Sequence, residues 1–260
     1  MSATAPTPPG DPTAGQDAGP TYGSYLALDT LLQLQHPLSD HPDELLFIVV
    51  HQSSELWFKV ILFEQRQLVR QLEAGDAERA LWHVERINRL MRIVSEQLAS
   101  LDTLPPQRFA EFRGHLGTSS GQQSLQFRIL EAASGRREPA FVELVSKHGP
   151  IPPEIQEHLD APTLEARFLA LLAREQTPLE ALYTGPGPGT LYFLAEALLA
   201  FEQEFARWRF LHMQLVERIL GPMTSGTGGT LGAGYLHRTT ALKFFPELWR
   251  VRQRFHAPTG

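Results

Sequence analysis

The segment LFIVVHQSSELWFK, residues 46–59, places polar residues in an otherwise apolar sequence. Apolar residues recur at steps of three, four and seven, at Leu46, Val49, Val50, Trp57, Val60 and Ile61. This periodicity predicts a helix over about 43–74, capped by Ser39 or Asp40. His51 follows Phe47 by one helical turn and precedes Glu55 by one turn. His51 is therefore either a hydrogen-bonded core residue or a residue that faces a ligand.

The rest of the chain shows the same helical periodicity. Apolar seams predict further helices over about 80–98, 124–133, 163–174 and 194–219. No stretch alternates apolar and polar residues between hairpin turns, as strands would. We therefore expect an all-α fold, a helical bundle in one domain over 21–260. Residues 1–20, rich in Pro, Gly, Ala and Thr, are expected to form a disordered tail and lack the pattern of a signal peptide.

Composition narrows the classes of function. The 260 residues are 42% hydrophobic and 20% charged, with a net charge of −6 and scattered arginines. We therefore expect neither nucleic acid nor a membrane as a partner, and a cytoplasmic location. No apolar run reaches the roughly 18 residues of a membrane-spanning helix. The absence of cysteine excludes disulfides, thiolate ligands and covalent attachment of haem through a Cys-x-x-Cys-His site.

Two histidines lie on the apolar faces of separate predicted helices, His51 in the first and His212 in the last. Either one alone is more often a hydrogen-bonded core histidine than a ligand. His51 and Glu55 share a helical face, but a metal site would need a third ligand at helical spacing, and no His-Glu-x-x-His pattern supplies one. A di-iron bundle requires Glu-x-x-His motifs, and neither Glu55 nor Glu217 has a histidine three residues later.

Two loops rich in small residues and one arginine add candidates for ligand binding. The segments 117–124 and 225–234 are either plain connections between helices or loops whose backbone amides hold a small polar group. Arg113 lies between aromatic residues, including Phe109, and either pairs with a protein carboxylate or clamps a substrate carboxylate.

Six segments, taken in order, resemble the tryptophan 2,3-dioxygenase family and span about residues 21–252. They are TYGSYLALDTLLQLQHPLS, DELLFIVVHQSSELWFK, FRGHLGTSSGQQSLQFR, WRFLHMQLVERILG, GTGGTLGAGYL and FFPELWRVR. The resemblance implies a helical fold, non-covalently bound haem b and a homotetramer. It also implies cleavage of the indole ring of L-tryptophan by O2, which gives N-formylkynurenine.

The resemblance further implies a role for each matched position. His212 matches the proximal haem ligand, and His51 matches the distal histidine that hydrogen-bonds the indole N–H. For the substrate, Phe47 and Phe109 match the aromatic contacts, Arg113 the carboxylate clamp and Thr227 the ammonium contact. Near the haem, the matched residues are Ser120 and Gly121. A segment lent by a neighbouring subunit corresponds to Tyr22, Tyr25 and Leu26.

The sequence departs from the family pattern in two loops. Gln122 replaces an aromatic residue in SGQQS, and Thr230 with Leu231 alters the second glycine loop. These departures leave two alternatives open. One is a related haem monooxygenase that converts a substituted tryptophan to a 2-oxindole, and the other is a haem sensor without turnover.

Overall fold

The computed structural model describes residues 19–147, 149–185, 187–221 and 239–255. The predicted tail, apart from its last two residues, and Thr227 lie outside these ranges. The chain divides into two compact units, Met1–His36 and Pro37–Gly260. The first unit contributes two short helices, α1 (Tyr22–Tyr25) and α2 (Leu28–Leu31).

The second unit confirms the all-α prediction, because its described residues form helices and no strand. Three helices are long: α3 (Glu44–Ala74), α4 (Ala77–Leu98) and α11 (Thr190–Leu220). The shorter α-helices are α5 (Pro106–Arg113), α6 (Leu125–Ser134), α7 (Pro139–Ser146), α8 (Pro153–Asp160), α9 (Leu164–Arg174), α10 (Ala181–Thr184) and α13 (Pro246–Gln253). Three 3-10 turns lie at η1 (Ala99–Thr103), η2 (Gly114–Leu116) and η3 (Gly121–Gln123).

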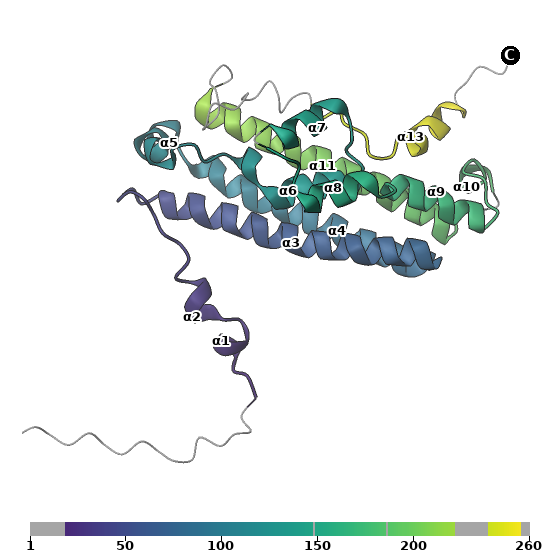
Figure 1. Ribbon diagram of the computed structural model, residues 1–260, viewed down its shortest axis with the longest axis horizontal. Helices are drawn as coiled ribbons and strands as arrows, with labels where there is room; N and C mark the ends of the chain where they lie inside the picture. The colour runs from purple at the N-terminus through teal and green to yellow at the C-terminus, as the bar shows by residue number, and fades with distance from the viewer. Residues whose placement is uncertain (1–18, 148, 186, 222–238, 256–260) are drawn as a thin grey trace, which may run out of the picture. The chain divides into compact units, whose positions relative to one another are not determined.

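The three long helices run side by side, with α4 packed against both α3 and α11, while α6 and α9 pack on α3 (Figure 1). A tight connection sets the α3–α4 pairing. Gly75 ends α3 with a φ of +86°, which favours glycine, and the Asp76 carboxylate then accepts the Arg79 N–H at 2.9 Å and caps α4.

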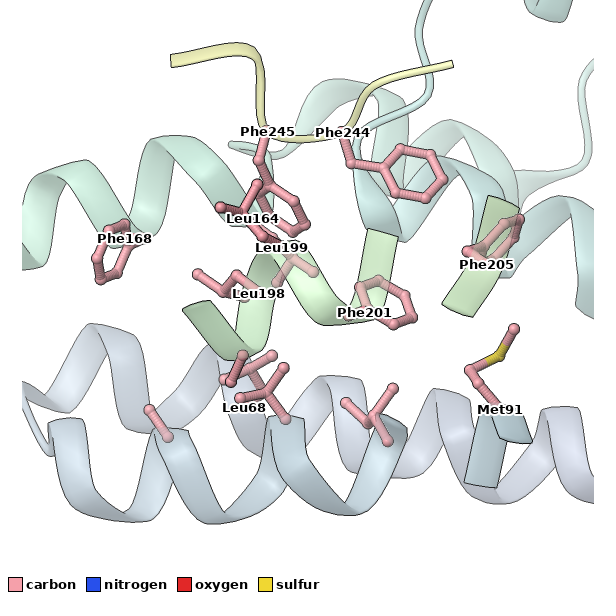
Figure 2. Close-up of a cluster of buried hydrophobic side chains, with 14 of the residues drawn as sticks. Leu68, Met91, Leu164, Phe168, Leu198, Leu199, Phe201, Phe205, Phe244 and Phe245 are labelled. Atoms are coloured by element: carbon pink, nitrogen blue, oxygen red, sulfur yellow. The ribbon is translucent and has the colours of Figure 1, made fainter. Parts of the chain in front are cut away.

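The core lies between these helices (Figure 2). Leu68 of α3, Met91 of α4, Phe168 of α9 and Phe201 of α11 are almost completely buried and belong to one cluster. Each such side chain contributes about 1.5–3 kcal/mol by leaving water. The packing fixes the long helices relative to one another, and therefore fixes the residues they carry.

The start of α3 differs from the prediction, because neither Ser39 nor Asp40 caps it. Asp43 is the N-cap and makes no side-chain capping bond. The Glu44 carboxylate instead accepts the N–H groups of Leu38 and Ser39, each at 2.8 Å. Glu44 is the first residue of α3, so these hydrogen bonds hold the preceding segment against the start of the helix.

One face of α3 remains exposed and apolar. By length and composition, α3 is the one helix in the described residues that could cross a membrane. Its opposite face belongs to the protein core, where buried Glu64 pairs with His83 and Arg86 of α4 at 2.7 and 2.9 Å. The exposed face, called here the α3 stripe, consists of Leu45, Val49, Leu56, Val60 and Phe63.

Candidate active site

A cavity is lined by residues of α3, α4, α6 and α11. Its walls are largely apolar, from Val50, Phe58, Leu98, Phe127 and Trp208. His51 of α3 and His212 of α11 line the same cavity. The fold therefore brings together the two histidines that stand 161 positions apart in the sequence.

The hydrogen bond of His51 fixes its tautomer. His51 Nδ1 lies 2.7 Å from the Phe47 carbonyl oxygen. A carbonyl oxygen can only accept, so Nδ1 carries the proton and Nε2 of the neutral ring is an acceptor. Burial lowers the pKa of His51, against smaller opposing effects of the Phe47 carbonyl and Glu55. The ring is exposed and borders the cavity, and because its pKa is lowered it presents a neutral acceptor at neutral pH.

His212 has the properties of a ligand rather than of a satisfied core residue. Its ring stacks on Trp208 with 5.2 Å between ring centroids. Its Nδ1 is buried and has no hydrogen-bond partner. Burial lowers the pKa of His212 to about 4, with further lowering by His51 and Arg128. The imidazole is therefore neutral at pH 7, which is the form that binds metals.

Phe47 and Phe109 form an aromatic wall next to His51. The Phe47 ring centroid lies 4.2 Å from that of His51 and 5.6 Å from that of Phe109. Phe109 and Phe112 come from α5 and are buried with Leu104. The predicted ring contacts therefore lie together, at the α5 side of His51.

The loop between α5 and α6 supplies another part of the cavity wall. Gly117 follows η2 with φ +56° and ψ −121°, a conformation that residues with a Cβ rarely adopt. Gly121 and Gln122 then line the cavity. Ser120 instead caps η3, its Oγ accepting the Gln122 N–H at 3.3 Å.

Other predicted residues do not line this cavity in the described part of the chain: Phe47, Phe109 and Ser120 lie outside its lining, and so do the residues below. Arg113 is the last residue of α5 and is half-buried. Thr227 lies outside the described residues. Tyr22 and Tyr25 belong to the first unit, where they are 78% and 76% exposed, and Leu26 is exposed beside them.

Sequence reasoning missed the charged end of the cavity. Arg128, Glu131, Arg136 and Arg209 all line it. Arg209 precedes His212 by three residues on α11, so the WRFLH segment carried a signal that the two residues share a helical face. The other three lie in and after α6, and no sequence pattern indicates that they lie near α11.

The residues present fit a haem. In the described part of the chain, no group of three or more His, Asp or Glu side chains could hold a bare metal ion. The idea of a His51–Glu55 metal pair gains no support, because Gln126 Nε2 already donates to a Glu55 carboxylate oxygen at 2.9 Å. A single neutral histidine, an apolar cavity and a charged end match a porphyrin that brings four ligand atoms of its own.

Comparisons with known proteins agree with this geometry. The family model described as "Tryptophan 2,3-dioxygenase" matches residues 10–149 and 166–255. A protein of that name from Kineococcus radiotolerans is 40% identical, over 89% of this chain and 90% of its own. Others come from Anaeromyxobacter sp. strain K (38%; 93% and 98%) and Bacillus thuringiensis strain Al Hakam (36%; 90% and 92%). The chain belongs to the tryptophan 2,3-dioxygenase family.

Proposed function

We propose that this protein cleaves the 2,3-bond of the indole of L-tryptophan with O2 and produces N-formylkynurenine, using non-covalently bound haem b. One observation carries the proposal. His51 and His212, from different long helices, line one apolar cavity in a chain of this family. His212 would hold the haem iron through Nε2, since its other ring nitrogen is buried.

When bound, the haem supplies the iron centre that makes dioxygen reactive toward the indole. The protein's own contribution is to bind and orient the substrate. His51 Nε2, an acceptor in the tautomer fixed by Phe47, would receive the hydrogen bond of the indole N–H. The aromatic wall of Phe47 and Phe109 would pack on the indole ring, and apolar lining would exclude water.

Polar contacts would hold the amino-acid part of the substrate. Arg113, close in sequence to Phe109, would clamp the carboxylate, and Thr227 would contact the ammonium group. Ser120 and Gly121 would shape the turn beside the haem. Gly121 lines the cavity, and Ser120 fixes the backbone of the turn through its capping bond.

We also propose a homotetramer in which Tyr22, Tyr25 and Leu26 close the pocket of a neighbouring subunit. The α3 stripe supports an assembly, because its five exposed apolar side chains occupy one helix that otherwise packs into the core. The exposed tyrosines of the first unit are also suited to an interface. A cytoplasmic location remains part of the proposal.

Replacing Leu56 with glutamate should break up this assembly, because a charge at the middle of an apolar interface must be buried unpaired. Light scattering should give about four times 29.1 kDa for the parent and a smaller mass for the variant. The control is Glu78→Gln, which changes a charge in the first turn of α4. An unchanged mass for Leu56→Glu would remove the α3 stripe from the interface.

Replacing His51 with alanine should lower kcat/KM for tryptophan by about 5- to 100-fold while leaving haem bound. The lost interaction is a hydrogen bond worth about 1 kcal/mol net, and more in a dry pocket. The analogue 1-methyltryptophan has no indole N–H, and its methyl group would crowd the imidazole. The variant should therefore discriminate less against this analogue than the parent does. Equal losses for both substrates would show that His51 does not hold the indole N–H.

The product of the reaction tests the proposal as a whole. Tryptophan added to the reduced holoprotein in air should give N-formylkynurenine. Both of the oxygen atoms inserted into the indole ring should derive from O2. A product with one inserted oxygen, or a haem spectrum without turnover, would contradict the proposed activity.

A further inference from the structure

Three arginines meet one glutamate at the charged end of the cavity. Arg128, Arg136 and Arg209, called here the arginine cluster, contact the Glu131 carboxylate at 2.5, 2.6 and 2.7 Å. Arg128 and Glu131 come from α6, Arg136 from the segment that follows it, and Arg209 from α11. All four residues line the cavity. The cluster therefore joins the two helices on either side of the proposed haem site.

The cluster carries more positive than negative charge in a buried place. Glu131, Arg209 and Arg136 are 1%, 3% and 4% exposed. A second carboxylate, Glu138, pairs with Arg136 at 2.6 Å from a more exposed position. Three guanidinium groups around one buried carboxylate favour the binding of a further anion.

Protonation does not remove this excess. Burial by itself would raise the pKa of Glu131, but Arg128, Arg209 and Arg136 outweigh it and hold that pKa below its usual value. Burial lowers the pKa of Arg209, opposed by Glu131, yet arginine remains charged near neutral pH. Glu131 thus contributes one full negative charge, and the three guanidinium groups remain cationic.

Arg128 has a buried N–H group that is available for a ligand. Its NH1 is used on Glu131, whereas its Nε is buried and has no hydrogen-bond partner. The guanidinium carbon lies 5.1 Å from the centre of the Phe127 ring, which forms part of the cavity wall. A guanidinium binds a carboxylate well, because two parallel N–H groups match the two carboxylate oxygens.

We propose that the arginine cluster binds a propionate carboxylate of the haem, with Arg128 as the contacting residue. The inference rests on the proposed haem site and deepens it. The two propionates are the anionic side chains of haem b, and the porphyrin would extend from His212 toward the cluster. Arg209 lies one helical turn before His212, and Arg128 is near enough to His212 to lower its pKa. Glu131 positions the arginines and spaces their charges.

The test compares haem b with haem b dimethyl ester, in which both propionates are uncharged. Affinity for each is measured by Soret titration of the apoprotein and by the rate of transfer to an excess of apomyoglobin. The parent should prefer haem b over the ester by about 10- to 100-fold, as expected for a charge-assisted hydrogen bond. Arg128→Gln should lose most of this preference, because the affinity for haem b should fall while the affinity for the ester stays unchanged. Arg128→Lys should keep an intermediate preference.

A matched control is Arg89→Gln, which removes an exposed arginine of α4 that does not line the cavity. This control should keep the preference of the parent. Equal affinity of the parent for haem and ester would overturn the inference, as would a preference that survives Arg128→Gln. If Arg128→Gln does not fold, the parent's own preference and Arg128→Lys decide the matter. Failure to bind either porphyrin would instead contradict the proposed haem site.

Discussion

Replacing His212 with alanine is expected to abolish stable haem binding and to eliminate turnover. His212 is the neutral imidazole on the α11 side of the cavity, and the described part of the chain contains no cluster of His, Asp or Glu that could hold a metal ion in its place. Mutation of a residue that only hydrogen-bonds to a metal ligand lowers metal affinity by about 10–100-fold. Loss of the ligand itself should cost more, and the remaining haem should have a changed Soret band.

The fold of the variant should survive, which separates loss of the ligand from misfolding. His212 Nδ1 is a buried polar atom without a partner, and such an atom destabilises the apoprotein by about 1–3 kcal/mol. Removing it should therefore leave the free energy of unfolding of the apoprotein nearly unchanged or higher. Added imidazole should restore part of the haem binding. His158→Ala, a half-buried histidine on α8, is the control and should bind haem normally. Full haem retention with an unchanged spectrum in His212→Ala would exclude this ligand.

Replacing Arg113 with alanine should lower kcat/KM for tryptophan by about two to four orders of magnitude. Loss of a buried two-pronged contact with a carboxylate costs about 3–5 kcal/mol, and each 1.36 kcal/mol corresponds to a factor of ten. Most of the effect should appear in KM, because the carboxylate is bound before and during the reaction. Tryptamine lacks the carboxylate, so the parent should use it poorly and Arg113→Ala should affect it little.

Arg108→Ala is the matched control for this prediction. Arg108 lies on the same helix, α5, but its guanidinium pairs with Asp43 at 2.7 Å near the surface. This variant should keep the preference for tryptophan over tryptamine. If the parent turns over both substrates equally well, Arg113 does not clamp the carboxylate.

Periodicity predicted the three long helices and also α6 and α9, but it missed the helices of eight residues. The predicted helices over 43–74 and 194–219 correspond to α3 and α11, because thirty residues of apolar spacing leave little ambiguity. Four eight-residue helices, α5, α7, α8 and α13, were missed. Each begins with proline, a recognised start signal, but two turns are too short to display a period.

Motifs predicted individual site residues but not their surroundings. The pairing of His51 and His212 came from matched segments, and the shared cavity supports it. The arginine cluster could not be predicted, since Arg128, Arg136 and Arg209 come from three segments that only folding brings together. The predicted cap of α3 was wrong for a similar reason. The Glu44 carboxylate accepts the N–H groups of Leu38 and Ser39, contacts that form only in the folded chain.

A crystal structure of the protein with haem and L-tryptophan, grown without oxygen, tests the central claim most directly. We expect iron bound to Nε2 of His212, the indole N–H directed at Nε2 of His51, and the substrate carboxylate on Arg113. Iron ligated by another residue, or tryptophan bound away from the cavity between α3 and α11, would contradict this claim.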